Sequence, residues 1–112
     1  MAQYMLLLYD NPTDWQGLSP EEMQKAVEKY IAWAKKPFNL DSKRLADDPG
    51  RVIRTQGGRT RTTDGPYSET KEVLGGYYTI EAKDYDEAVQ RVLDHPHLAY
   101  GGTIEVRQVY GT

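Results

Sequence analysis

The hydrophobic pattern opens with a continuous apolar run from Tyr4 to Tyr9. Both alternating sides of this run are apolar, with Tyr4, Leu6 and Leu8 on one side and Met5, Leu7 and Tyr9 on the other. A strand that is apolar on both faces must be covered on both faces. We therefore predict a central strand here, with a covering layer on each side of its sheet.

A helix is predicted from about Pro20 to Lys36. Ser19 suits the N-cap, Pro20 suits the first helical position, and Glu22 completes a capping box. Pro37 cannot continue the helix and ends it. The apolar stripe that recurs at helical spacing before it consists of Met23, Val27, Tyr30, Ile31 and Ala34. The spacing of these apolar residues indicates an amphipathic helix with one apolar stripe.

A second helix is predicted after Asp84, which acts as the N-cap with Glu87 three residues later. Pro96 closes it. Its apolar stripe consists of Tyr85, Ala88, Val89, Val92 and Leu93.

Further strands are predicted at Glu72 to Ala82 and at Thr103 to Tyr110, where apolar and polar residues alternate. Gly75-Gly76 within the first of these indicates a bulge or a close approach of another backbone. The pairing between residues 40 and 63 stays open. Residues 42–46 could pair with 52–55 around Asp48-Pro49-Gly50, and residues 52–55 could pair with 59–63 around Gly57-Gly58.

The order of these elements predicts a ferredoxin-like, split βαβ fold of the α+β class, as a single domain over residues 1–112. Both helices would lie on one face of an antiparallel sheet. The second face of the central strands would then stay bare. We therefore expect a homodimer, a dimeric α/β-barrel whose apposed sheets enclose a cavity.

Composition narrows the class of protein. The 112 residues include no cysteine, which excludes disulfides and cysteine-bound zinc, and the formal net charge is −3. No apolar run approaches the roughly 20 residues of a membrane span. The first residues lack the charged region of a signal peptide, so we expect a cytoplasmic protein without a membrane partner.

Positive charge gathers in residues 43–71, which hold seven basic and four acidic residues. This segment carries +3 and the remainder of the chain −6. A nucleic-acid-binding domain would be basic over a broader surface, whereas this chain has a pI near 5.3, so nucleic acid is an unlikely partner. Two readings remain: solvated arginines that protect a hairpin, or one or two arginines that grip an anionic ligand.

The most distinctive segment is Asp64-Gly65-Pro66-Tyr67-Ser68-Glu69-Thr70-Lys71-Glu72, followed by Leu74-Gly75-Gly76-Tyr77-Tyr78. It resembles the DGPF group of the YCII-related family, with Tyr67 where that group usually has phenylalanine. The resemblance extends over nearly the whole chain, through Tyr4-Met5-Leu6-Leu7, Ser42-Lys43-Arg44-Leu45-Ala46, Pro96-His97-Leu98 and Gly101-Gly102-Thr103-Ile104-Glu105-Val106-Arg107.

The resemblance implies a ferredoxin-like fold and a dimeric α/β-barrel. Some YCII-like proteins act on chlorinated muconolactones with a His/Asp pair whose histidine lies on the first helix. This chain has no histidine between Ser19 and Lys36, so that pair is not carried over. Some relatives occur beside sigma-factor-like proteins, which implies an association with a sigma factor.

Two residues are candidates for acid–base catalysis. His97 could act as a base or acid near neutral pH, or it could cap a helix end. Asp64 could be a catalytic carboxylate, or the acceptor that holds the Asp-Gly-Pro turn.

Five residues are candidates for ligand binding: Arg44, Tyr9, Tyr78, Glu69 and Lys71. Arg44 could hold a carboxylate or lie over the sheet edge, and the two tyrosines could line a pocket or belong to the core and interface. Glu69 and Lys71 could instead form a surface ion pair. The two histidines, at i and i+2, make a poor metal site, and we expect no metal or cofactor.

Three classes of function remain. The first is a dimer that binds a small anionic organic molecule in a cavity. The second is a cofactor-free lyase or isomerase acting on a small organic acid or lactone. The third is a protein–protein interaction module linked to transcription regulation.

Overall fold

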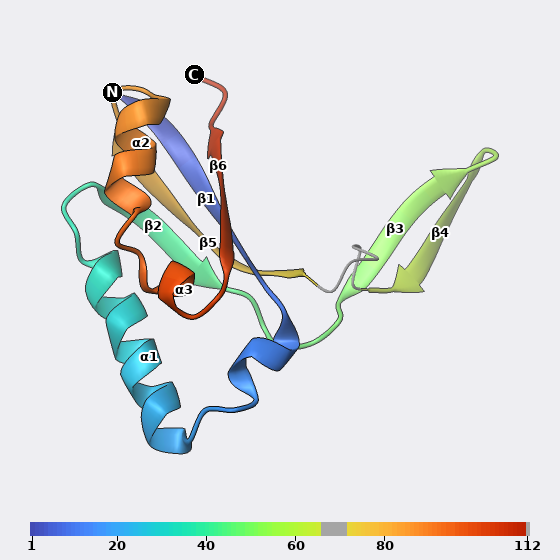
Figure 1. Cartoon of the computed structure of the whole chain (residues 1–112). Helices are drawn as coiled ribbons and strands as arrows, with labels where there is room; N and C mark the ends of the chain where they lie inside the picture. The colour runs from blue at the N-terminus through green and yellow to red at the C-terminus, as the bar shows by residue number, and fades with distance from the viewer. Residues whose placement is uncertain (66–71, 112) are drawn as a thin grey trace.

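The computed structural model describes residues 1–65 and 72–111 of the chain. Its main sheet has four antiparallel strands in the order β2-β5-β1-β6, formed by β1 (Ala2–Asp10), β2 (Asn39–Arg44), β5 (Val73–Ala82) and β6 (Thr103–Gln108). The helices are α1 (Pro20–Ala34), α2 (Tyr85–Val92) and the short α3 (Pro96–Ala99), and a 3-10 turn, η1 (Pro12–Trp15), follows β1. Figure 1 shows this arrangement. The order of strands and helices is that of the predicted ferredoxin-like fold.

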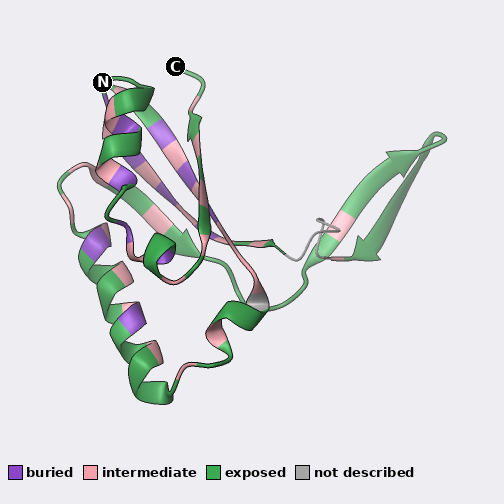
Figure 2. Ribbon diagram, viewed as in Figure 1, coloured by how far each residue is buried: buried purple, intermediate pink, exposed green. Residues whose placement is uncertain are grey.

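The core lies between the helices and one face of β1 and β5. Tyr4, Leu6 and Leu8 of β1 are buried there, with Tyr78 and Ile80 of β5. These residues share a face because Leu6 pairs with Tyr78 and Tyr4 with Ile80. In Figure 2 the buried positions lie on the sheet, on the helices and on the link between α2 and α3.

The predicted irregularity at Gly75-Gly76 is confirmed. Leu8 pairs with Gly76 and Tyr9 with Leu74, so Gly75 is left out of the ladder as a bulge. A Cβ on Gly76 would lie 2.8 Å from the carbonyl oxygen of Lys43 on β2. Glycine is therefore required where β2 approaches β5.

Helix α1 begins as its sequence predicts. The Ser19 side chain accepts the backbone N–H of Glu22, and the Glu22 carboxylate accepts the N–H of Ser19. Its C-terminal half is tied to the segment after α2, because Trp33 Nε1 donates to Asp94 Oδ1 over 3.0 Å and Lys36 lies 2.7 Å from Asp94 Oδ2. These bonds hold the C-terminal end of α1 against the rest of the helical layer.

Pro96 does not simply end the second helix. Helix α2 stops at Val92, and Pro96 is the first residue of α3, whose N-cap is His95. Proline suits this first position, since its missing N–H has no partner there. The reading of His97 as a cap at the end of the preceding helix is therefore wrong: His97 lies inside α3.

Strands β3 (Arg51–Gln56) and β4 (Arg59–Asp64) form a separate two-stranded ribbon around Gly57-Gly58, as the second of the two predicted pairings requires. The other alternative, pairing of residues 42–46 with 52–55, is wrong, because β2 pairs with β5. Gly57 and Gly58 both have positive φ, which suits the tight turn. The ribbon projects from the rest of the chain in Figure 1.

No described helix covers the second face of the sheet, which turns Met5, Leu7 and Tyr9 away from the core. These three side chains are half-buried. Their partners on β6 are polar, whereas those on β5 include Tyr77 and Leu74. Among the described residues, no helix is long and apolar enough to cross a membrane.

Candidate functional site

A pocket of about 450 Å³ lies on the helix side of the sheet, where β1 and β2 end and β5 begins. Helix α1 forms one wall with Ala26 and Tyr30, and the sheet forms the opposite wall with Leu8 and Tyr78. This pocket lies within one chain, and it is a different place from the predicted cavity between the sheets of two copies, which stays a prediction. The N-terminal end of α1 stands away from the sheet in Figure 1.

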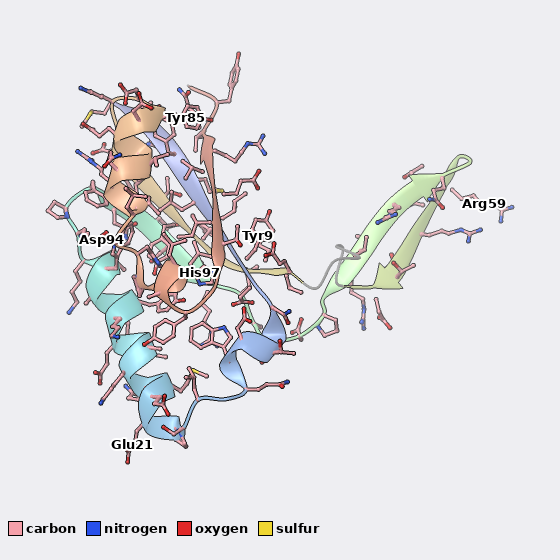
Figure 3. All side chains as sticks on the ribbon, in the orientation of Figure 1. Tyr9, Glu21, Arg59, Tyr85, Asp94 and His97 are labelled. Atoms are coloured by element: carbon pink, nitrogen blue, oxygen red, sulfur yellow. The ribbon has the colours of Figure 1, made fainter. Side chains whose placement is uncertain are left out.

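A chain of three polar groups crosses the inner end of the pocket. The Tyr30 hydroxyl lies 2.7 Å from His97 Nδ1, and His97 Nε2 lies 2.8 Å from the backbone carbonyl oxygen of Tyr9. His97 is only 2% exposed, and Tyr30 is half-buried. Figure 3 shows His97 between the helices and the sheet.

The Tyr9 carbonyl decides which nitrogen of His97 carries the proton. A carbonyl oxygen can only accept, so Nε2 must donate to it. In the neutral imidazole Nδ1 is then an acceptor, and the Tyr30 hydroxyl donates to it. The geometry therefore leaves the lone pairs of the Tyr30 oxygen available to a molecule in the pocket.

The surroundings keep Tyr30 protonated. Burial raises the pKa of the Tyr30 phenol well above its ordinary value, the neighbouring Tyr78 and Asp10 raise this pKa further, and Arg44 partly offsets them. Burial also raises the pKa of Tyr78 to about 12. Both phenols are therefore neutral proton donors near neutral pH.

Asp10 and Trp15 close the side of the pocket next to η1. Trp15 Nε1 donates to Asp10 Oδ2 over 3.3 Å, and the indole ring lies 6.2 Å from the ring of Tyr30. Asp10 ends β1, whereas Arg44 ends β2 on the other side of β5. A carboxylate and a guanidinium therefore both border the pocket.

The comparison with protein-family models decides the family, since the model described as YCII-related domain matches residues 2–111. The chain belongs to the YCII-related family. An uncharacterised protein from Rhizobium meliloti (strain 1021) is 27% identical over 96 residues, which are 81% of this chain and 77% of that protein.

A solved structure with the same fold is 5-chloro-2-hydroxyhydroquinone dehydrochlorinase (TftG) from Burkholderia phenoliruptrix AC1100, in complex with 2,5-dihydroxybenzoquinone. The TM-score is 0.58 and the identity 15%, over 98% of this chain and 95% of that one. At 15% identity this likeness establishes only the fold of the YCII-related chain, which is ferredoxin-like.

In this YCII-related chain the two predicted catalytic residues are placed apart. His97 lines the pocket, whereas Asp64 ends β4 on the ribbon, is not among the pocket-lining residues, and forms a 2.7 Å ion pair with Arg51. The Asp64 side chain is 79% exposed. Within one chain, the structure therefore does not bring Asp64 and His97 together as an acid–base pair.

The predicted ligand-binding residues divide in the same way. Arg44 and Tyr78 line the pocket, but the Tyr9 hydroxyl points to the opposite face of the sheet and donates to Glu105. Tyr9 contributes to the site only through its backbone carbonyl oxygen, which accepts a hydrogen bond from His97 Nε2. Glu69 and Lys71 lie outside the described residues.

Sequence reasoning missed Tyr30 and Asp10. Tyr30 was counted in the apolar stripe of the first helix, where a tyrosine is usually a core aromatic. Asp10 carried one signal, because it is a carboxylate placed directly after an apolar strand. Nothing local indicates that Tyr30 meets a histidine 67 positions later.

The packing of His97 predicts a strong effect at Gly102. A Cβ on Gly102 would overlap the imidazole ring of His97, which is buried and fixed at both nitrogens. We expect Gly102→Ala to displace the ring and to lower the free energy of unfolding by roughly 1–3 kcal/mol. Urea unfolding measures the change. Gly17→Ala is the control, because a Cβ at Gly17 meets nothing within 4 Å; equal stability of the two variants would contradict this placement of His97.

Proposed function

We propose that the pocket binds a small acidic organic molecule and that Tyr30 and His97 accept a proton from it. The observation that carries this proposal is the 2.7 Å contact between the Tyr30 hydroxyl and His97 Nδ1, with His97 Nε2 held by the Tyr9 carbonyl. The chemistry is general base catalysis through a relay of two side chains.

The proposed step transfers one proton. A C–H or O–H bond of the ligand breaks, and its electron pair stays on the ligand. The ligand proton goes to the Tyr30 oxygen while the phenol proton of Tyr30 moves to His97 Nδ1. The ligand becomes an enolate or phenolate, and His97 becomes an imidazolium whose Nε2–H still donates to the Tyr9 carbonyl.

The walls of the pocket suit a planar molecule with an anionic edge. The rings of Trp15, Tyr30 and Tyr78 offer flat apolar surfaces, and Arg44 at the border offers a charge to a carboxylate or an enolate. The ligand of the TftG complex, 2,5-dihydroxybenzoquinone, is a hydroxylated ring of this chemical kind. It supports an acidic hydroxylated ring as the class of ligand.

A titration with 2,5-dihydroxybenzoquinone, followed by absorbance and by calorimetry, tests the proposal. We expect saturable binding, with a dissociation constant at least about tenfold higher in Arg44→Gln, because a charge-assisted hydrogen bond is lost. Lys83→Gln is the control, since Lys83 follows the opposite end of β5. If neither this ring nor a panel of small carboxylic acids and lactones binds, the proposal is wrong.

The alternative for the same pocket is binding without proton transfer. It predicts that the dissociation constant of the ligand does not change when the Tyr30 hydroxyl is removed. A protein–protein interaction module is less favoured, because it provides no reason for a histidine and a tyrosine to be paired inside a pocket.

We also propose a homodimer through the bare sheet face. Met5, Leu7 and Tyr9 form an apolar row there that no described helix covers, and apposed sheets would bury it. Light scattering should then report twice the chain mass of 12.8 kDa. A mass of one chain at micromolar concentration would contradict the dimer.

A further inference from the structure

The β3–β4 ribbon is extended away from the described body of the chain. Its two strands pair with each other, and neither packs extensively on another described element. The radius of gyration is 16.0 Å, whereas a compact chain of this length has about 13 Å. Figure 2 shows the ribbon as exposed nearly throughout.

The strand register gives the ribbon two different faces. One carries three arginines and a glutamine, since Arg54 pairs with Arg61 and Gln56 with Arg59, and it bears Val52 opposite Thr63 nearer the base. The other carries Ile53 opposite Thr62 and Thr55 opposite Thr60, whose hydroxyls lie 3.0 Å apart. At the base of this second face, Arg51 and Asp64 neutralise each other. We call the second face, which bears Ile53, the Ile53 face.

The Ile53 face suits packing, but no described helix or other strand of this chain packs extensively on the ribbon. Ile53 is 68% exposed, and its neighbours on this face are β-branched threonines that suit a half-buried sheet surface. A two-stranded hairpin is marginally stable in water when nothing covers it. Since the described body of this chain does not cover the ribbon, the exposed Ile53 face is available to another molecule.

Charge favours a second copy of the chain as that molecule. Residues 51–64 hold four arginines and one aspartate, so the ribbon carries +3, whereas the remainder of the chain carries −6. The ribbon of one copy is therefore attracted to the body of another. A nucleic acid would instead have to approach the acidic body from which the ribbon extends.

We propose that the ribbon is a docking arm whose Ile53 face packs on a second copy of this chain. This proposal depends on the proposed homodimer. In that dimer the arm would form a second contact between the two copies, outside the interface between their sheets. Arg59, near the free end of the ribbon (Figure 3), reaches toward carboxylates of that second copy. Neither Arg59 nor Arg61 forms an ion pair with any described residue of its own chain.

Sedimentation velocity over a range of concentrations tests the arm. We expect the dimer dissociation constant to rise at least about tenfold in Ile53→Asp and in Arg59→Glu/Arg61→Glu, and the double variant to lose part of its salt dependence. Leu93→Asp is the matched control, because Leu93 is an apolar side chain on the helical layer with 59% exposure. Circular dichroism checks that each variant is folded.

A cross-link identifies what the ribbon touches. Because the chain has no cysteine, Thr62→Cys places a single benzophenone label on the Ile53 face. Mixed with unlabelled chains grown on heavy nitrogen, the label should attach to heavy peptides of the other copy. Attachment only within its own chain would overturn the proposal.

Three further outcomes separate the arm from the other proposals. If Leu7→Asp dissociates the dimer but Ile53→Asp and Arg59→Glu/Arg61→Glu do not, the sheet interface stands and the arm is wrong. A monomeric wild-type chain overturns both. A monomer whose ribbon arginines bind heparin or duplex DNA would assign the ribbon to a polyanion and overturn the arm. The binding of 2,5-dihydroxybenzoquinone is measured separately and is decided by the pocket alone.

Discussion

Lowering the pH from about 7 to about 4 is expected to cost this protein about 3 kcal/mol of folding free energy through His95 alone. His95 is 1% exposed, and its ring lies against those of Trp33 and Tyr78 at centroid distances of 4.5 and 4.8 Å. This burial, and then the neighbouring His97, lowers the pKa of His95 from 6.5 to about 4. His95 is therefore neutral in the folded protein near neutral pH.

The hydrogen bonds of His95 agree with a neutral ring. Its Nδ1 accepts the backbone N–H of His97 over 3.0 Å, so the proton of the neutral ring is on Nε2. Nε2 has no hydrogen-bond partner among the described residues. Protonation would place a charge among aromatic rings and remove the acceptor that caps α3.

The direction of the pH effect follows from the lowered pKa. The unfolded chain binds a proton at His95 below about pH 6.5, and the folded chain does so only below about pH 4. The stability from the neutral ring is thus fully present above about 6.5 and is lost as the pH falls toward about 4. Urea unfolding at a series of pH values measures it.

His95→Asn is the informative variant, because the asparagine oxygen can still accept the N–H of His97 but does not titrate. We expect its stability to be lower at neutral pH and to fall less steeply between about pH 6.5 and about pH 4. The lowered pKa of Asp94, which arises mainly from its hydrogen bond with Lys36, acts in both proteins and cancels in the comparison. Parallel curves for the two proteins would contradict the neutral, buried His95.

Removing the Tyr30 hydroxyl is expected to reduce proton transfer by about 100-fold or more. Tyr30→Phe keeps the ring that lines the pocket, but it breaks the connection between a bound ligand and His97 Nδ1. The exchange of an acidic C–H of the ligand for deuterium, followed by NMR on a panel of enolisable lactones and cyclic hydroxyketones, measures this step directly.

Two further variants separate a relay from a general loss of structure. Tyr85→Phe removes a hydroxyl that bonds the backbone N–H of Gln108, away from the pocket, and should leave the exchange rate unchanged. His97→Gln should slow the exchange as Tyr30→Phe does, and the double variant should be little slower than either alone, because the two groups act as a unit. Additive losses would argue against the relay.

Much of the fold could be predicted because its signals are local. The capping box of Ser19 and Glu22 and the apolar stripe of α1 each act within a few residues of the chain. The bare sheet face also followed from sequence, since β1 is apolar on both sides. The second helix was predicted less well: Pro96, taken as its end, in fact begins α3.

The candidate site could be predicted only in part. His97, Arg44 and Tyr78 were named and do line the pocket, whereas Asp64 belongs to the ribbon. A turn motif shows that Asp64 is held locally, but it does not show where the ribbon points. Tyr30 was assigned to the apolar stripe of the first helix, because helical spacing does not distinguish a packed phenol from one that faces a pocket.

The sequence by itself determined the two longer helices, the strands β1, β5 and β6 and their order, because backbone sterics, side-chain period and caps depend on neighbouring residues. Only the tertiary structure decided that α1 and α3 bring Tyr30 to His97 and that the Tyr9 carbonyl sets the proton of that ring. Only it decided that β2 pairs with β5, which leaves β3 and β4 to form the ribbon. Contacts between residues distant in the chain depend on how whole elements pack, and no local pattern records that packing.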